Sequence, residues 1–206
     1  MNYLIFDTET SGLARFDLPP DDPIQPRLLS IACLILNENL NEKSSFYALV
    51  HPGKQIFIDP NATKANGIMW EDIDKFGVPV NVALGLFNLF AAQVDLVVAH
   101  NIKFDSFIID IELANQMVGD FRYDWKEQTY CTMLQMTDIC KLPGKRGYKW
   151  PKLREAFAHC FPERGTFNEH HAMEDVRACA DIFRWLKNRE KKMEVINEAI
   201  AAAPVS

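Results

Sequence analysis

The chain has 206 residues, of which 48% are hydrophobic and 24% charged, a balance typical of a globular domain and not of a disordered chain. It contains no run of about 18 uninterrupted apolar residues and no basic segment ahead of an apolar one at its start, so we expect neither a membrane span nor a signal peptide. The net charge of −6 argues against a protein that coats nucleic acid through a basic face, but it is compatible with clustered carboxylates that bind divalent cations.

Three apolar segments near the N-terminus predict an antiparallel meander. Residues 3–6 form a short run typical of a strand buried on both faces, and residues 27–36 and 44–50 have the composition of further strands. The proline-rich stretch 17–26 between the first two predicts a loop.

The rest of the chain alternates helical segments with short strands. The clearest early helix is expected over residues 79–92, with Asn81 as its N-cap. The other expected elements are short helices over 61–66 and 70–76, a strand over 95–99, a helix to about 117, a strand over 130–132, a helix over 133–139, an irregular stretch over 142–151, a helix over 152–161 and a long helix from 171 or 172 to about 192. This order predicts an α/β domain with a mixed central sheet flanked by helices, over residues 1–190, followed by a short helical tail over 191–206.

The cysteines show no pattern of a metal site. Cys33, Cys131, Cys140, Cys160 and Cys179 are scattered and include no C-x-x-C pair, in which zinc sites usually appear. We therefore expect buried thiols in a cytoplasmic protein.

The first candidate site residues end the first strand. Asp7 and Glu9 are two positions apart, so their carboxylates project to the same side of a strand. Adjacent carboxylates resist joint ionisation unless a cation binds between them. Taken alone, this D-x-E pattern is more often an ordinary acidic strand end.

The second candidate segment, H-N-I-K-F-D, directly follows the strand over 95–99. It places Asp105 in the first turn of a helix, beside a strand end, where open α/β sheets bind ligands. Helix capping by Asp105 and a turn at Asn101 explain the segment equally well by themselves.

The third candidate segment, H-H-A-M-E-D, opens the last helix. On one continuous helix His170 and Asp175 would lie well apart, whereas a His170 in the preceding loop can reach the site that Asp175 faces. A solvated histidine pair and an acid favoured by the helix dipole are the alternative for this motif alone.

Together, the three motifs resemble those of the DEDD exonuclease superfamily, and the similarity runs from Tyr3 to about Phe183. The matching segments are F-D-T-E-T-S-G-L, V-V-A-H-N-I-K-F-D and H-H-A-M-E-D. The chain also resembles free-standing relatives of the epsilon proofreading subunit of bacterial replicative polymerase.

The resemblance assigns catalytic roles to five residues. Asp7, Glu9, Asp105 and Asp175 would be the metal-binding acids, and His170, five positions before the last aspartate, would be the histidine of the DEDDh branch. The other main branch has a tyrosine four positions before that aspartate, where this chain has a second histidine.

The same resemblance implies a ribonuclease-H-like fold and a 3′–5′ exonuclease that releases nucleoside 5′-monophosphates from single-stranded or frayed 3′ ends. Two Mg²⁺ or Mn²⁺ ions are the expected cofactors, because both ions prefer hard oxygen ligands. His170 would accept a proton from the attacking water, with His171 as the fallback. DNA is favoured over RNA as the partner only by this resemblance.

Residues around the motifs are candidates for substrate binding: Thr8, Thr10, Gly12, Leu13, Asn101 and Phe104. The turn from Thr8 to Leu13 is expected to hold the terminal sugar and 3′-hydroxyl, while Leu13 and Phe104 contact the last base. Packing within the turn and the core is an equal alternative for these two side chains. Relatives often read H-G-I where this chain has Asn66-Gly67-Ile68, a change that affects the terminal nucleotide and not the metal ligands.

A basic segment lies outside the motifs. Lys141, Lys145, Arg146, Lys149 and Lys152 crowd one short stretch that also contains two aromatic residues. The segment either contacts the backbone of the incoming strand or forms a solvated loop whose aromatic rings turn inward.

Three other functions are alternatives to a DNA exonuclease. An exoribonuclease would carry the same motifs, since no residue here can be tied to recognition of a 2′-hydroxyl. An inactive nuclease fold that only binds nucleic acid is disfavoured because all five motif residues are intact. A small-molecule-binding domain is disfavoured because the sequence has no glycine-rich phosphate loop.

Overall fold

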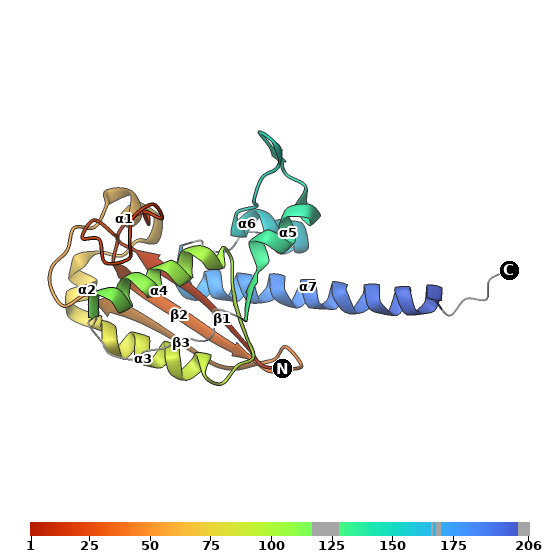
Figure 1. Cartoon of the computed structure of the whole chain (residues 1–206), viewed down its shortest axis with the longest axis horizontal. Helices are drawn as coiled ribbons and strands as arrows, with labels where there is room; N and C mark the ends of the chain where they lie inside the picture. Colours follow the sequence, from red (N-terminus) through yellow and green to blue (C-terminus); the bar gives the residue numbers. More distant parts are fainter. Residues whose placement is uncertain (117–127, 166, 168–169, 202–206) are drawn as a thin grey trace.

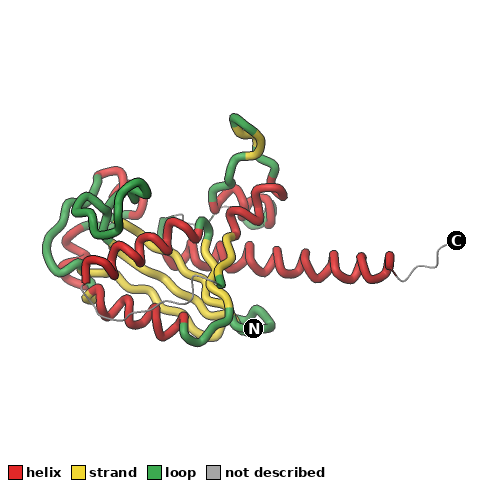
Figure 2. Tube along the Cα trace, viewed as in Figure 1, coloured by secondary structure: helices red, strands yellow, loops and turns green. Residues whose placement is uncertain are grey.

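The computed structural model of the chain describes residues 1–116, 128–165, 167 and 170–201. In Figure 1 a twisted sheet lies between layers of helices, and Figure 2 shows the strands as one continuous layer. Within the described residues, no helix has both the length and the apolar character needed to cross a bilayer.

Six strands form the central sheet in the spatial order β4-β3-β2-β1-β5-β6. The pairs β1–β2 and β2–β3 are antiparallel, whereas β5 pairs parallel with both β1 and β6, and β4 pairs parallel with β3. The bounds are β1 Tyr3–Thr10, β2 Leu28–Leu36, β3 Glu42–His51, β4 Val78–Pro79, β5 Leu96–Ala99 and β6 Thr129–Cys131. The predicted mixed α/β sheet is confirmed, and the two-residue β4 is an addition to it.

The two central strands are buried on both faces, so their side chains pack alternately into two helical layers. Phe6 packs against Phe87 of α3, with ring centroids 5.0 Å apart, and on the opposite face Tyr3 packs against Phe183 of α7 at the same distance. Helix α4 joins α3 on the first face. The bounds are α3 Val80–Ala91, α4 Ile102–Gln116 and α7 Ala172–Ala201.

Four shorter helices surround this core. Helices α5 and α6 pack against α7 through Met136, Phe157 and Ile182. Helices α1 and α2 follow β3, and Asp59 caps the first of them by accepting a hydrogen bond from the backbone N–H of Asn61. The bounds are α1 Pro60–Asn66, α2 Trp70–Phe76, α5 Thr132–Cys140 and α6 Leu153–Cys160.

The start of α3 corrects one prediction. The helix begins at Val80, with Pro79 in the N-cap position and no capping side chain, so the prediction of Asn81 as the N-cap is wrong. The reason is that β4 ends at Pro79 and the chain passes directly from strand to helix, which leaves Asn81 inside the first turn.

Two more segments differ from expectation. The stretch 142–151, expected to be irregular, contains a hairpin of β7 Pro143–Gly144 and β8 Gly147–Tyr148. Helix α7 continues well past the predicted end near residue 192. The predicted end of α4 near residue 117 lies outside the described residues.

Candidate active site

Three elements bring the four motif carboxylates to one cleft. Asp7 and Glu9 project from the C-terminal half of β1, Asp105 from the first turn of α4, and Asp175 from the first turn of α7. Because β5 pairs parallel with β1 and leads directly into α4, both strands deliver their following residues to the same edge of the sheet. All four side chains line a cleft of about 420 Å³.

Asp105 is held in a fixed orientation by a neighbouring strand residue. It is 3% exposed, and its Oδ1 accepts hydrogen bonds from the backbone N–H of Thr8 at 3.0 Å and from the Thr8 hydroxyl at 2.8 Å. Thr8 itself is buried. Its side chain therefore orients an acid of the cleft, although Thr8 also lines the cleft wall.

The carboxylates raise one another's pKa. Burial, followed by the charges of Asp105, Asp175 and Glu9, holds the pKa of Asp7 well above its usual range. Burial and the charge of Asp175 raise the pKa of Glu9 to about 8, and a hydrogen bond from the Asn66 side chain partly opposes this increase.

The pKa of Asp105 is also raised, to about 7, mainly by burial. The two hydrogen bonds that Thr8 donates to it only partly oppose this increase. Several acids that resist joint ionisation at neutral pH form a site whose charge a bound cation would neutralise. The donor set consists of carboxylate oxygens, which fits hard divalent ions such as Mg²⁺ or Mn²⁺.

His170 lies in the loop ahead of α7, as the sequence predicts. Its backbone has φ 64°, in the left-handed region, and its N–H donates a hydrogen bond of 3.1 Å to Asp175 Oδ2. The side chains of Glu9, His170 and Asp175 each offer one ligand atom, and these three atoms lie within 4.8 Å of one another.

The neighbouring histidine has different surroundings. The ring of His171 stacks on Tyr47 of β3, with centroids 5.2 Å apart and planes at 18°. The backbone carbonyl of His171 accepts hydrogen bonds from Glu174 and Asp175 and so begins α7. His170 lines the cleft, and His171 is not among its lining residues.

The residues predicted to bind substrate separate into two groups. Thr8, Thr10, Gly12, Leu13 and Phe104 all line the cleft. Leu13 is 87% exposed at the rim of the cleft, so its side chain is not packed within the turn.

Asn101, by contrast, is not among the residues that line the cleft. Its backbone has φ 74°, and its carbonyl accepts a hydrogen bond from Phe104 N–H at 2.8 Å. Asn101 therefore shapes the turn between β5 and α4, the role that the turn alternative gives it.

Several cleft residues were not predicted. One wall is formed by α1 and its cap, which contribute Asp59, Asn61, Ala62 and Ala65 beside the noted Asn66. The wall is tied to the turn after β1 by a hydrogen bond of 2.8 Å from Asp59 N–H to the Ser11 carbonyl. No local sequence signal announces this pairing of distant segments.

His100 is the other unpredicted lining residue, although it belongs to the second motif. Its Nδ1 lies 2.9 Å from the Thr132 hydroxyl and its Nε2 lies 3.0 Å from the Pro151 carbonyl oxygen. Burial lowers the pKa of His100 to about 4, so the ring is neutral at physiological pH. Its position beside Asn101 in H-N-I-K-F-D was the signal that could have marked it.

The sheet order and the carboxylates at one edge are those of a nuclease with the ribonuclease-H-like fold. Comparison with known proteins agrees: the model of the exonuclease family (RNase T) matches residues 4–183. The chain belongs to this exonuclease family, in its DEDDh branch. No curated protein sequence matches it.

Solved structures of Exonuclease I share the fold. Escherichia coli Exonuclease I in complex with a dT13 oligonucleotide superposes with a TM-score of 0.71 and 14% identity, over 95% of this chain and 43% of that chain. The enzyme from Methylocaldum szegediense gives 0.68 and 20%, over 93% and 41%. The zinc-bound form of the E. coli complex with single-stranded DNA gives 0.65 and 18%, over 93% and 41%. The chain thus spans about two fifths of the length of these proteins.

Proposed function

We propose that the protein removes nucleotides from the 3′ end of DNA, acting on single-stranded or frayed ends and releasing nucleoside 5′-monophosphates. The observation that carries the proposal is the convergence of Asp7, Glu9, Asp105 and Asp175 in one cleft, with the pKa of at least three of them raised. Such a cluster is electrostatically unfavourable without cations and suits two-metal phosphodiester hydrolysis.

The four acids are assigned to two divalent ions, Mg²⁺ or Mn²⁺. In this proposal Glu9 and Asp175 would hold one ion and Asp105 the other, and Asp7 would contribute to both. When bound, the ions would neutralise the scissile phosphate and acidify the attacking water. Thr8 keeps Asp105 pointed into the cleft through its two hydrogen bonds.

His170 is assigned as the general base. It stands beside Glu9 and Asp175 at the open side of the cleft and is exposed, so it can take a proton from the attacking water and pass it to solvent. Its imidazole is also within ligand distance of the same site, but Mg²⁺ and Mn²⁺ favour the oxygen donors around it. The stacking of His171 on Tyr47 supports His170 over its neighbour.

The cleft walls are assigned to the terminal nucleotide. Leu13 at the rim and Phe104 inside would contact the last base, and the backbone from Thr10 to Gly12 would hold the terminal sugar. Asn66 takes the place of the histidine that relatives often have. Its amide donates to the Thr10 carbonyl at 3.3 Å, so it stabilises the turn that faces the sugar.

DNA is proposed as the substrate because the structures that share this fold include Exonuclease I bound to DNA oligonucleotides. Repair or replication would be the corresponding cellular process. The five cysteines are free thiols, which supports the proposed cytoplasmic location.

DNA and RNA oligomers of matched sequence, labelled at either end and digested side by side, test both the polarity and the sugar preference. Faster trimming of the RNA would overturn the DNA assignment.

Asp7→Asn tests the metal assignment. The substitution keeps the size of the side chain and removes a charge from a site where it is repelled, so we expect a folded protein without measurable hydrolysis in Mg²⁺ or Mn²⁺. Circular dichroism checks folding, and release of labelled mononucleotides checks activity. Asp110→Asn on α4, a residue outside the cleft lining, is the control and should retain turnover. Retained hydrolysis in Asp7→Asn would refute the assignment.

A further inference from the structure

The hairpin β7–β8 forms an arm that projects from the body of the protein. We define the arm as residues 141–150. It leaves the end of α5, runs out along β7, turns at Lys145 and Arg146 and returns along β8 to the start of α6; Figure 1 shows it reaching beyond both helices. Gly144 allows this tight pairing, because a Cβ at that position would come within 2.9 Å of the Lys149 nitrogen.

The arm concentrates positive charge in a protein whose net charge is −6. It contains Lys141, Lys145, Arg146 and Lys149 and no acidic residue. Lys149 pairs with Glu155 at 2.6 Å, whereas no described acidic side chain forms an ion pair with the other three. Lys145 and Arg146 at the turn are also exposed, so a polyanion can reach both side chains.

The arm also presents two aromatic rings to solvent. Tyr148 is 51% exposed and Trp150 is 65% exposed. The alternative that the rings turn inward is therefore wrong for both. Exposed aromatic rings between cations are the combination with which proteins bind single strands, by stacking on bases while the cations contact phosphates.

A half-buried histidine connects the base of the arm to the catalytic cleft. Pro151, the residue that follows the arm, is buried, and its carbonyl oxygen lies 3.0 Å from Nε2 of His100. His100 lines the cleft beside Asp105 and Phe104. The base of the arm therefore lies next to a residue that lines the cleft.

We propose that the arm is a second binding site for the nucleic acid strand, contacting nucleotides upstream of the 3′ end while that end lies in the cleft. This inference rests on the proposed function. Lys145 and Arg146 contact phosphates, and Trp150 and Tyr148 stack on unpaired bases. The occupant is single-stranded nucleic acid, because stacking requires bases that are free of a complementary strand.

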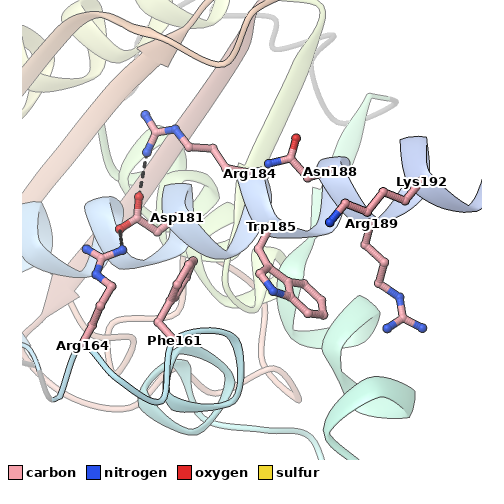
Figure 3. A pocket seen from close by; sticks show the side chains of 8 residues that line it. All are labelled: Phe161, Arg164, Asp181, Arg184, Trp185, Asn188, Arg189 and Lys192. Atoms are coloured by element: carbon pink, nitrogen blue, oxygen red, sulfur yellow. Dashed lines mark hydrogen bonds and ion pairs between the residues drawn. The ribbon is translucent and has the colours of Figure 1, made fainter.

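A second basic surface among the described residues differs from the arm. A pocket between α7 and the segment that follows α6 contains Arg164, Arg184, Arg189 and Lys192 (Figure 3). Asp181 pairs with Arg164 at 2.7 Å and with Arg184 at 2.9 Å, so part of its charge is already neutralised. This pocket shares no lining residue with the catalytic cleft, and it therefore provides a matched control.

The test compares the variants Lys145→Ala/Arg146→Ala and Trp150→Ala with the control Arg189→Ala/Lys192→Ala, which removes the same charge as the first. Binding of a long 5′-fluorescein oligothymidylate to the full chain is followed by anisotropy at several salt concentrations. We expect the Kd to rise about 10-fold in each arm variant and to change less than about twofold in the control. The slope of log Kd against log salt should fall by about 1.4 in the double arm variant, the value for two lost phosphate contacts.

Hydrolysis separates the arm from the catalytic cleft. In the arm variants, the KM for the long oligothymidylate should rise by a similar factor with unchanged kcat, while kcat/KM for a thymidine dinucleotide, too short to reach the arm, stays at the wild-type value. Unchanged binding of the long strand, an equal loss in the control, or an equal loss on the dinucleotide would overturn the inference. If the wild type hydrolyses neither substrate, the proposed function fails, and the anisotropy result still decides the arm.

Discussion

Two adjacent histidines, His170 and His171, have different surroundings because of the backbone conformation of His170. The left-handed φ of 64° at His170 turns the chain just ahead of α7, so that one ring faces Glu9 and the other stacks on Tyr47. Residues other than glycine adopt this conformation at a cost, which is tolerated where the surrounding structure requires it. The backbone N–H of His170 is held by Asp175, so the acid and the histidine form one unit.

We therefore predict different results for the two histidines. His170→Ala should lower kcat by roughly 10²–10⁴-fold, the usual effect of losing a general base, while His171→Ala should retain most of it. Single-turnover assays on a short DNA strand measure both. A large loss in His171→Ala with an active His170→Ala would reverse the assignment.

At the level of single residues, the sequence could predict which acids lie together in the cleft, but not which other residues surround them. The i, i+2 spacing of Asp7 and Glu9 determines their common side, since a strand has a period of two. The wall formed by α1 depends on the bond from Asp59 to Ser11, between residues far apart in the chain, and nothing local encodes it. Thr8 was expected to face only substrate, whereas its hydroxyl also orients Asp105.

Among the elements, β2 and α4 are joined by a buried ion pair. Glu112 is 0% exposed and accepts two hydrogen bonds from the Arg27 guanidinium, at 2.9 and 2.7 Å, and a third from Leu28 N–H. The contact connects the first residue of β2 to the helix that carries Asp105. Because Arg27 is itself largely buried, removal of one partner leaves an uncompensated charge.

Glu112→Gln should accordingly lower the free energy of unfolding by about 3 kcal/mol, as expected when one member of a buried pair is neutralised. The control is Asp17→Asn, which breaks the exposed pair of Arg15 and Asp17 and should change the free energy of unfolding far less. Urea unfolding followed by circular dichroism measures both values. Equal effects of the two substitutions would show that burial of the Arg27 pair adds nothing.

Elements with a strong hydrophobic period were predictable, and those defined by contacts were not. The buried runs of β1 and β2 and the position of α7 follow from local pattern. Strand β4 exists only through its pairing with β3, and the hairpin β7–β8 depends on close backbone approach at Gly144. Both are too short for periodicity to be visible.

At the scale of the whole molecule, the carboxylates that would bind cations destabilise the folded protein when no cation is bound and they must ionise. The folded-state pKa is about 8 for Glu9, against an ordinary value of 4.5, and about 7 for Asp105, against 3.8. The folded protein therefore binds more protons than the unfolded chain between these values. The stability that the two groups contribute is fully present below about pH 4 and is lost as the pH rises through 7 to 8.

The loss of stability with rising pH predicts how pH and divalent ions together affect the Tm. In EDTA, the Tm of the wild type relative to Glu9→Gln should fall as the pH is raised from 5 to 8, because only the wild type must ionise the buried glutamate. The difference between the two proteins removes the contribution of other groups, such as His100, whose lowered pKa acts in the opposite direction.

Mn²⁺ at pH 8 should restore the Tm of the wild type, since an ion that binds only the folded state stabilises it. At pH 5 Mn²⁺ should have little effect on the Tm, because protons compete for the same oxygens. Differential scanning fluorimetry at the two pH values, with and without Mn²⁺, measures the four conditions. A Tm gain of the same size at both pH values, or in Glu9→Gln as large as in the wild type, would mean that the ions bind elsewhere and that the cluster at the end of β1 is not the metal site.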